Sequence, residues 1–401
     1  MVNAMSTLIP NTPTKYRRMF PIDKFQSLHT PFYYYDIALL RHTLETVVTE
    51  SGKYPNYHVH YAIKANHDPR LLSIIASHGL GADCVSGGEI ACAIQAGIPC
   101  HQIVYAGVGK SDAEIALALE HEIGCFNVES LAELRVINEI AEKMNRQARV
   151  AFRVNPDVDA HTHEKITTGL SENKFGISLA HLSQAVEEAK QSSAVTLIGL
   201  HFHIGSQIEQ MHVFQTLCER INTIVSQLAD QGIALQSINV GGGLGVDYRH
   251  PLDHPLPDFA KYFHTFHSHL RLPQGMEVHF ELGRSIICQC GHLISRVLYV
   301  KEGEAKKFVI LDAGMNDLIR PAMYGARHHI THLTAPHDAA TETYDIVGPI
   351  CESSDIFAIA QQFPYTRRGD LLAIHSAGAY GQSMASCYNS RPLAPAVYSE
   401  A

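Results

Sequence analysis

The sequence predicts an α/β fold, namely a (β/α)8 TIM-type barrel with a smaller all-β domain. Strand-length apolar segments alternate with helical segments eight times between about residues 57 and 285, and this alternation is typical of a parallel sheet. Several of the strand segments are apolar throughout, as expected for strands buried on both faces. After residue 285 helical segments become few and hairpin patterns dominate. An open, doubly wound sheet is the alternative for the first part.

Each strand of the predicted barrel is followed by a helix. The first strand is expected at 57–64 and its helix at 68–78, which Gly79 closes. Ser-x-x-Glu sequences open three of the following helices and predict capping boxes at Ser86/Glu89 and Ser111/Glu114 and an N-cap at Ser130. Later helical patterns fill 179–192, 208–231 and 257–270. The other seven strands are expected at 81–85, 103–106, 125–128, 150–154, 197–203, 237–240 and 278–281.

The flanking segments predict the second domain. Residues 1–31 contain four prolines and are expected to lack regular structure. A strand at 32–35 lies outside the barrel count, and a helix is expected at 37–50. Beyond the barrel we expect a hairpin, 292–301 with 307–312, and strands at 344–347 and 371–376. The predicted domains are therefore a barrel over 45–285 and a β domain built from 1–44 and 286–401. The long loop 155–178 is expected to be functional.

Composition excludes several classes of protein. The 401 residues are 46% hydrophobic and 18% charged, which is typical of a globular protein. The net charge of −9 disfavours nucleic-acid binding. The first 20 residues lack the apolar core of a secretory signal, and no segment approaches the roughly 20 apolar residues of a membrane span. Nine scattered cysteines without a C-x-x-C pair favour free thiols in a reducing cytoplasm.

Unusual residues cluster at the predicted carboxyl ends of the barrel strands. Barrel enzymes carry their chemistry at that edge. Each residue alone has an ordinary structural explanation, such as a surface lysine or a tight glycine turn. Their shared edge is difficult to assign to chance. The residues are Lys64, Asp83, Arg153, His203, the run Gly241–Gly242–Gly243, Glu281, Gly283 and Arg284.

The chemistry of this set indicates pyridoxal phosphate. The glycines after strand seven, with Gly283 and Arg284 after strand eight, form the usual phosphate cradle of a barrel. Lys64 would hold the aldehyde cofactor as a Schiff base. Glu281 would pair with the pyridine nitrogen and keep it protonated. His203 would lie against the ring. A metal site at His201 and His203 is disfavoured, because no carboxylate or cysteine has matching spacing.

Eight sequence motifs carry a resemblance to a known family over about residues 25–395. The chain resembles the fold-type III pyridoxal-phosphate-dependent decarboxylases, which have an alanine-racemase-like barrel. Within that family the motifs are most similar to those of enzymes that decarboxylate diaminopimelate. One residue departs from the pattern, because Leu282 stands where the family usually has proline. The motifs are YAIKAN, GADCVSGGEI, GLHFHIGSQ, NVGGGLGVDY, ELGRSI, IRPAMYGARH, VGPICESSD and GAYGQSMASCYNSRP.

The resemblance implies roles for matching positions. Lys64, His203 and Cys351 would be catalytic, with Cys351 the candidate proton donor. The cofactor would contact Lys64, Asp83, Arg153, His203, Ser206, Gly242, Gly243, Glu281, Gly283, Arg284 and Tyr380. The substrate would contact Arg284, Arg320, Tyr324, Glu352 and Tyr380. The family's active sites form at a dimer interface, with the Cys-Glu pair donated by the partner, which implies a homodimer with shared sites.

The reaction implied is decarboxylation of meso-2,6-diaminopimelate at its D-centre to L-lysine and CO2, the last step of bacterial lysine biosynthesis. The alternative within the family is a decarboxylase of ornithine, arginine or lysine. Arg320 and Arg284 favour diaminopimelate, because its second carboxylate requires cations. A racemase is less consistent with the C-terminal pattern. A non-catalytic regulatory homologue is disfavoured, because Lys64, the glycine run and Cys351 are all retained.

Overall fold

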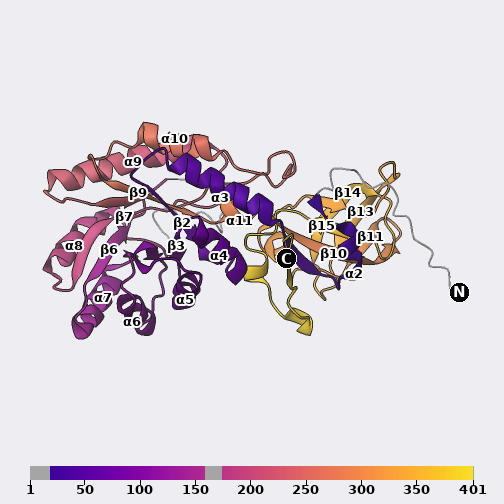
Figure 1. Cartoon of the computed structure of the whole chain (residues 1–401), viewed down its shortest axis with the longest axis horizontal. Helices are drawn as coiled ribbons and strands as arrows, with labels where there is room; N and C mark the ends of the chain where they lie inside the picture. The colour runs from indigo at the N-terminus through magenta and orange to yellow at the C-terminus, as the bar shows by residue number, and fades with distance from the viewer. Residues whose placement is uncertain (1–18, 159–173, 401) are drawn as a thin grey trace. The chain divides into compact units, whose positions relative to one another are not determined.

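The structure is a computed structural model that describes residues 19–158 and 174–400. These residues form two compact units (Figure 1). The barrel unit comprises 41–246 and 256–286, and the β unit comprises 19–40, 247–255 and 287–400 of the described residues. Each unit is built from more than one stretch of the chain.

The barrel unit closes a ring of eight parallel strands. Each strand pairs with the next along the chain, and the last strand pairs with the first. The predicted barrel is therefore confirmed, and the open-sheet alternative is wrong. The strands are β2 Tyr57–Ala62, β3 Gly81–Cys84, β4 Ile103–Tyr105, β5 Cys125–Val128, β6 Ala148–Arg153, β7 Val195–His201, β8 Ser237–Asn239 and β9 Glu277–Leu282.

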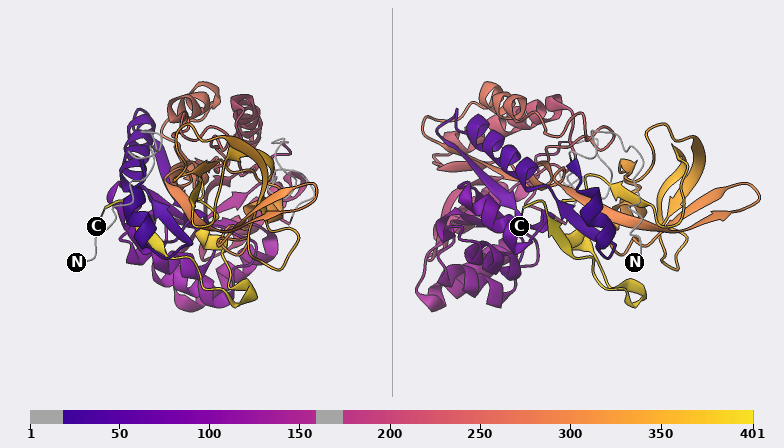
Figure 2. Two further views of the ribbon diagram at one scale, coloured as in Figure 1. Left: turned by 90° about the vertical axis from the view of Figure 1, so that its right-hand side faces the viewer. Right: turned by 45° about the vertical axis from the view of Figure 1, so that its right-hand side comes forward.

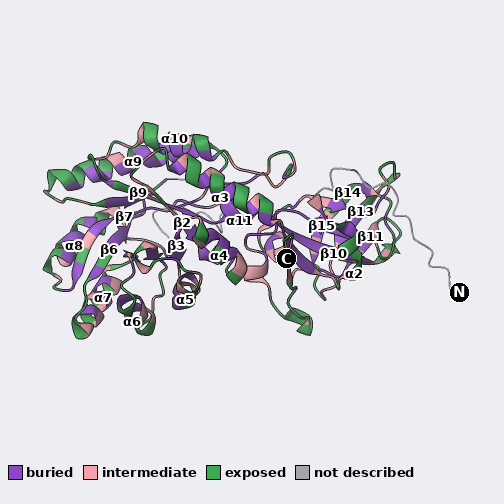
Figure 3. Ribbon diagram, viewed as in Figure 1, coloured by how far each residue is buried: buried purple, intermediate pink, exposed green. Residues whose placement is uncertain are grey.

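Helices surround these strands (Figure 2). Their inner faces are buried and their outer faces exposed (Figure 3). In the longest of them, Val213, Leu217, Ile221 and Val225 are buried at helical spacing, which packs one apolar stripe inward. The helices are α3 Ile37–Ser51, α4 Pro69–Ser77, α5 Gly87–Gln95, α6 Asp112–Glu120, α7 Leu131–Met144, α8 Leu179–Gln191, α9 Met211–Asp230 and α10 Phe259–His269.

One of the two predicted capping boxes is complete. At α6, Ser111 and Glu114 bond each other's backbone N–H groups reciprocally. At α5, Ser86 accepts from the N–H of Glu89, but the Glu89 carboxylate accepts from the N–H of Val85 instead. The prediction of a box there is wrong, because Glu89 is used to bind the end of β3. The N-cap predicted at Ser130 is confirmed.

Two barrel strands end two residues before the predicted position. β2 ends at Ala62, and Lys64 lies in a 3₁₀ turn, Ile63–Ala65. This turn buries Ile63 and Ala65 and leaves Lys64 half-buried. β7 ends at His201, so His203 follows the strand by two residues. The apolar residues in each segment continue beyond the last ladder pair, which explains the overextended predictions.

The β unit is one sheet, with strand order β12-β15-β10-β11-β13-β14, to which β1 is added through β10 and β16 through β1. The predicted hairpin is confirmed as antiparallel β10 and β11, which Figure 2 shows in orange. The strand predicted at 32–35 is β1 of this sheet. The strands are β1 Phe32–Tyr35, β10 Gly291–Glu302, β11 Lys307–Leu311, β12 Ile330–His332, β13 Thr341–Val347, β14 Ile356–Pro364, β15 Leu371–Ile374 and β16 Ala396–Tyr398.

The described part of the N-terminal segment is structured, contrary to the prediction. A short helix, α2 Ile22–Ser27, follows Phe20. Phe20 and Phe25 are buried against Phe32 and Tyr34. The prolines do not prevent this helix, because none falls inside it. Residues 1–18, and 159–173 of the predicted functional loop, lie outside the described residues. No helix in the described ranges is long and apolar enough to cross a bilayer.

Candidate active site

Lys64 and a buried carboxylate meet just beyond the ends of β2 and β3. Lys64 Nζ lies 3.2 Å from Asp83 Oδ2. Asp83 is fully buried, and its Oδ1 has no hydrogen-bond partner in the described parts of the chain. A buried carboxylate that is half satisfied by one lysine places a fixed charge or a proton beside the amine. The amine itself keeps 38% of its side chain exposed, so a small molecule can reach it.

The Glu281 carboxylate near the end of β9 accepts three hydrogen bonds inside the barrel. Asn127 Nδ2 and Asn239 Nδ2 donate to Oε1, at 3.2 and 2.8 Å. His201 Nε2 lies 3.0 Å from Oε2. Since Glu281 is buried, these contacts replace the water that an exposed carboxylate would bind. The charge of Glu281 is therefore held by the barrel interior.

Asp83 and Glu281 have opposite pKa shifts. Burial, followed by the charge of Glu281, raises the pKa of Asp83 above its ordinary value. Burial also acts to raise the pKa of Glu281, but His201 and Lys64 outweigh it, and the pKa lies well below the ordinary value. Two carboxyls whose surroundings separate their pKa values are typical of a catalytic site. Glu281 is thus the ionised member of the pair.

His203 faces the glycine run that follows β8. The backbone N–H of Gly242 donates to His203 Nδ1 at 3.3 Å. Burial, then the positive charges of Arg153 and Lys64, lower the pKa of His203 well below its ordinary value. The ring is therefore neutral at pH 7, and a neutral imidazole can pack flat against another ring without a desolvation penalty for charge.

The glycine run leaves no room for side chains. A Cβ on Gly242 would lie 1.9 Å from the carbonyl oxygen of Glu281, and one on Gly243 would lie 2.8 Å from that of Gly205. Gly241 and Gly243 also have positive φ angles of 73° and 108°. Only glycine permits this close backbone approach with this conformation. Such a loop can present backbone N–H groups to an anion.

Arg284 and Ser206 lie together in the barrel unit. Arg284 Nη2 donates to Ser206 Oγ at 3.0 Å, and its Nε lies 3.3 Å from the same oxygen. Arg284 is buried at the start of α11 Arg284–Ile287. Gly283 before it packs against Ala62 and Ala65, where a Cβ would approach to 3.1 and 3.0 Å. A guanidinium, a hydroxyl and a glycine loop are the donors that a phosphate ester requires.

Arg153 forms a buried ion pair. Its Nη1 lies 2.8 Å from Glu129 Oε1, and its guanidinium lies 4.6 Å from the centre of the Phe175 ring. Glu129 also accepts from the N–H groups of Gly107 and Gly176. Arg153 thus lies at the predicted edge of the barrel, but most of its charge is neutralised by Glu129.

In the β unit, Arg320 is buried without a carboxylate partner. It opens α12 Arg320–Tyr324, a short helix that was not predicted from the sequence; Pro321 is tolerated there because it occupies the first turn. Its Nη1 donates to His328 Nε2 at 2.8 Å, and its guanidinium lies 4.5 Å from the Tyr248 ring centre. No carboxylate of the described residues pairs with it, so Arg320 is not part of an ordinary surface ion pair.

His328 has a fixed proton position. Its Nδ1 donates to the carbonyl oxygen of His375 at 2.8 Å, so the lone pair of Nε2 receives the Arg320 proton. A neutral ring therefore supports the guanidinium and leaves its positive charge uncompensated. A buried guanidinium in this state requires an anion.

The Cys351–Glu352 pair is exposed in the β unit. Glu352 Oε1 accepts from Tyr388 Oη at 2.6 Å, and the N–H of Cys351 donates to Asn389 Oδ1 at 3.0 Å. Asn389 and Ser390 both have positive φ angles, which are unusual for residues other than glycine. The pair is therefore held by a strained turn. The two predicted tyrosines also lie in this unit: Tyr324 ends α12, and Tyr380 has a φ of 56°.

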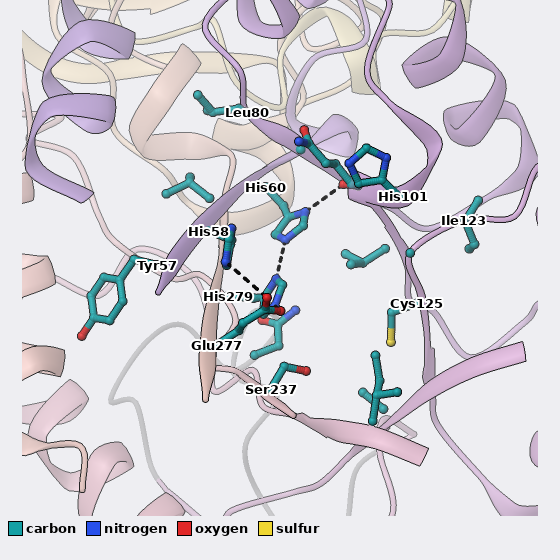
Figure 4. A pocket seen from close by; sticks show the side chains of 18 of the residues that line it. Tyr57, His58, His60, Leu80, His101, Ile123, Cys125, Ser237, Glu277 and His279 are labelled. Carbon is teal, nitrogen blue, oxygen red and sulfur yellow. Dashed lines mark hydrogen bonds and ion pairs between the residues drawn. The ribbon is translucent and has the colours of Figure 1, made fainter. Parts of the chain in front are cut away.

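A cavity of about 660 Å³ lies at the opposite, amino-terminal end of the barrel (Figure 4). His60 Nε2 lies 2.8 Å from His279 Nδ1, and His60 Nδ1 lies 3.0 Å from the carbonyl oxygen of Gln102. His58 and Glu277 complete this end, as Figure 4 shows. No group of three or more metal-ligating side chains suitable for an ion occurs in the described ranges. The cavity lies away from the strand ends that carry Lys64.

Several residues of the site were not predicted from sequence. His201, Asn127 and Asn239 contact Glu281 through side chains that face the barrel axis. Their signal was present, since polar residues in otherwise apolar strands require a partner. His328 and Tyr248 around Arg320 had no comparable signal, because the chain brings them together from distant segments.

Comparisons with known proteins support one family. Residues 41–288 match the model of the pyridoxal-dependent decarboxylases, pyridoxal binding domain. The chain is 56% identical to diaminopimelate decarboxylase of Bacteroides thetaiotaomicron over 94% of this chain and 97% of that protein. It is 40% identical to the enzyme of Aquifex aeolicus, over 94% and 88%.

Solved structures agree with this result. Diaminopimelate decarboxylase from Helicobacter pylori complexed with L-lysine superposes with a TM-score of 0.88, at 39% identity, over 95% of this chain and 94% of that one. A lysine/ornithine decarboxylase from Vibrio vulnificus shares the fold, with a TM-score of 0.80 over 95% and 97% at 23% identity. The strand-end chemistry and these similarities lead to one conclusion: this chain belongs to the pyridoxal-dependent decarboxylases, in the diaminopimelate decarboxylase family.

Proposed function

We propose that the protein removes CO2 from the D-centre of meso-2,6-diaminopimelate and releases L-lysine. Relatives between 40% and 56% identical over most of the chain carry the name diaminopimelate decarboxylase. The observation that carries the choice of substrate is the buried Arg320 guanidinium, whose partners among the described residues are a neutral imidazole and an aromatic ring. A second carboxylate distinguishes diaminopimelate from ornithine, arginine and lysine, and it supplies the anion that Arg320 requires.

The chain uses pyridoxal phosphate, and the donor set of the barrel unit fits this cofactor. Pyridoxal phosphate supplies an electron sink for the pair released when the carbon–carboxylate bond breaks. Lys64 would hold it through Nζ. The loop at Gly242 and Gly243, with Ser206, Gly283 and Arg284, would bind its phosphate. Glu281 would accept from the ring nitrogen, and His203 would pack against the ring.

The remaining residues are proposed to bind the substrate or to support the residues that bind the cofactor. Arg320 and Tyr324 would bind its distal end, with Arg284 and Tyr380 beside the cofactor. Asp83 would hold the Lys64 ammonium while that group is not bonded to the cofactor. Arg153 would lie near the cofactor as an ion pair with Glu129, and this pair would add little net charge to the site.

We further propose a homodimer in which Cys351 and Glu352 act in the partner's site, with Cys351 as proton donor to the substrate carbon. Their exposure and the strained turn that holds them support this proposal. The barrel unit would bind the cofactor, and the β unit would recognise substrate and form the dimer. The nine cysteines are free thiols, which suits the cytoplasm.

The decisive experiment is a CO2-release assay over a panel of amino acids, with and without added pyridoxal phosphate. We expect meso-diaminopimelate to react at least about a hundredfold faster in kcat/KM than L-lysine, L-ornithine or L-arginine, because those lack the second carboxylate. Arg320→Leu should remove most of this preference. Faster release from L-ornithine or L-lysine would show that the protein is instead a decarboxylase of those amino acids.

A further inference from the structure

Three buried side chains donate hydrogen bonds to the Glu281 carboxylate, and none of them has a role in the proposed function. Of the three donors on it, His201 comes from β7, Asn127 from β5 and Asn239 from β8. All three are at most 5% exposed. We infer that His201, together with Asn127 and Asn239, is a positioning set that holds Glu281 ionised and aimed at the ring nitrogen of the cofactor. The inference rests on the proposed function, because the partner of Glu281 is the cofactor.

The orientation of one amide is fixed independently of Glu281. Asn239 Oδ1 accepts from the backbone N–H of Gly241 at 2.9 Å. Its Nδ2 must therefore face Glu281 and donate. Asn127 Nδ2 reaches the same oxygen, and the thiol of Cys125 lies 3.9 Å from Asn127 Oδ1. An oxygen that receives two N–H donors cannot carry a proton without losing one of them, so Oε1 is an acceptor only.

The proton on His201 can also be placed. His201 Nδ1 is buried and has no hydrogen-bond partner in the structure, and Nε2 faces Glu281. A proton on Nδ1 would be a buried donor without an acceptor, which costs more than an unfilled lone pair. His201 therefore donates Nε2–H to Glu281.

Burial would otherwise neutralise Glu281. A carboxylate removed from water without donors takes up a proton, and a protonated Glu281 could not stabilise a protonated ring nitrogen. The positioning set prevents this. The other titratable or charged groups that act on Glu281 or are acted on by it are Lys64, Asp83, His203, His60, His279, Cys125 and Tyr262.

Infrared titration of the full-length protein without cofactor tests the inference directly. The difference spectrum against Glu281→Gln isolates the carboxyl band of Glu281 between pH 5 and 9. We expect an ionised band throughout this range in the wild type. In His201→Leu, which removes the donor, the carboxyl should take up a proton within this range, because burial without that donor should raise its pKa above pH 5. His201→Gln keeps an N–H donor without any charge, so it should restore the ionised band.

Two further variants complete the design. His332→Gln changes a buried histidine of the β unit and should leave the Glu281 band unchanged. Asn127→Ala removes one of two donors from Oε1 and keeps His201, so it should give a smaller shift than His201→Leu. It also serves if His201→Leu does not fold. An ionised Glu281 over the whole pH range in both His201→Leu and Asn127→Ala would overturn the inference.

A second readout uses the loaded protein. With pyridoxal phosphate labelled with ¹⁵N in the ring, the nitrogen chemical shift reports which atom carries the proton. It should indicate a protonated ring in the wild type and in His201→Gln, and a largely unprotonated ring in His201→Leu. Failure of the wild type to bind the labelled compound would contradict the proposed function and leave the infrared result standing. An unchanged shift in His201→Leu would contradict the positioning role alone.

Discussion

In both units, a backbone group fixes the orientation of a polar side chain that contacts a functional residue. Asn239 is oriented by the N–H of Gly241, and His328 by the carbonyl oxygen of His375. In each case a backbone group selects which side-chain atom faces the functional residue. These residues thus tune charge without carrying any themselves.

Replacement of His328 by leucine should weaken substrate binding. The variant removes the acceptor that holds the Arg320 Nη1 group at 2.8 Å. Without this acceptor the Arg320 guanidinium keeps its charge, but its orientation is less well fixed. We therefore expect KM for meso-diaminopimelate to rise about tenfold, with kcat changed less. Steady-state kinetics measure both values. His337→Leu, at an exposed position of the same unit, is the control and should leave both unchanged. A loss confined to kcat would argue against this role.

His292 should make the β unit sensitive to acid. Both ring nitrogens are buried without hydrogen-bond partners among the residues that the structure describes, and burial lowers the pKa of His292 to about 3. Below about pH 6.5, His292 is protonated in the unfolded chain but not in the folded chain. The free energy of unfolding therefore falls as pH falls from 7 towards 3. At pH 5 this amounts to about 2 kcal/mol.

His292→Phe should reduce this loss. The ring packs edge-on against Phe20 and His375, with centroid distances of 5.0 and 4.9 Å, so an aromatic replacement suits the site. We expect the fall in unfolding free energy between pH 7 and pH 5 to be smaller by about 2 kcal/mol than in the wild type. Urea unfolding at both pH values measures it. Comparing the two pH values within each protein cancels any cost of the larger ring, and equal falls in both proteins would contradict the prediction.

At the scale of elements, buried glutamates join the ends of neighbouring barrel strands to the helices that follow. Glu133, in the first turn of α7, accepts from the N–H of Glu129 at 2.8 Å and from Lys110 Nζ at 2.6 Å. Lys110 Nζ also donates to the carbonyl oxygens of Gly107 and Asn127. The Lys110 side chain is only 1% exposed. This buried ion pair therefore fixes the loop after β4 to the end of β5.

Lys110→Met should destabilise the barrel strongly. It leaves the Glu133 carboxylate, whose side chain is only 11% exposed, without its cation, at a cost of about 3 kcal/mol in unfolding free energy at pH 7. The double variant Lys110→Met with Glu133→Gln should recover much of that loss, because no charge then remains buried. Lys143→Met is the matched control. It breaks an exposed pair with Glu139 and should cost less than about 0.5 kcal/mol. Equal losses from the two lysine variants, by urea unfolding, would refute the argument.

The sequence predicted elements well where their pattern is local. The eight barrel strands and the hairpin at 291–311 follow from apolar runs separated by turns and helices. β12, β14 and β16 were not predicted. β14 carries exposed residues in its second half, and β16 is three residues long, so neither shows a clear apolar pattern. Strand ends at 62 and 201 depend on the last ladder pair, which composition does not reveal.

The candidate site was predicted unevenly for a related reason. Residues such as Lys64, Glu281 and Arg284 were predicted because strand ends share one edge of a barrel. The helix at Arg320 was missed because five residues are too few to show helical periodicity. The acceptor role of His328 depends on a carbonyl 47 residues away, which no local pattern encodes.

For the whole molecule, acid acts on the two classes of buried group in opposite directions. His60 and His279 have their pKa values lowered to about 3 and about 4, mainly by burial, so the folded chain loses stability as pH falls below about 6.5. Burial raises the pKa of Glu89 to about 7 and of Asp317 to about 6, so protonation of these carboxyls favours the folded chain as pH falls from 7 towards 4.5. The net pH dependence is therefore shallower than the histidine content suggests.

Replacing the two carboxyls with raised pKa values, Glu89 and Asp317, should make the whole protein more sensitive to acid. In Glu89→Gln with Asp317→Asn, the compensating protonation is absent. We expect the fall in unfolding free energy from pH 7 to pH 5 to be steeper by about 2 kcal/mol or more than in the wild type. Thermal and urea unfolding at the two pH values measure this difference. Glu139→Gln with Glu187→Gln, at exposed positions, is the control pair. An unchanged slope would contradict the opposing roles.

The three-residue strand β8 ends at Asn239, and this one amide touches two parts of the site. Its oxygen receives the N–H of Gly241 at the start of the glycine loop, and its nitrogen supports Glu281. In the proposed site, the loop that would bind the phosphate and the carboxylate that would face the ring nitrogen are therefore held by the same side chain. A rotation of that amide would break both hydrogen bonds together, so a substitution of Asn239 should change the affinity for the phosphate and the protonation of the ring at once.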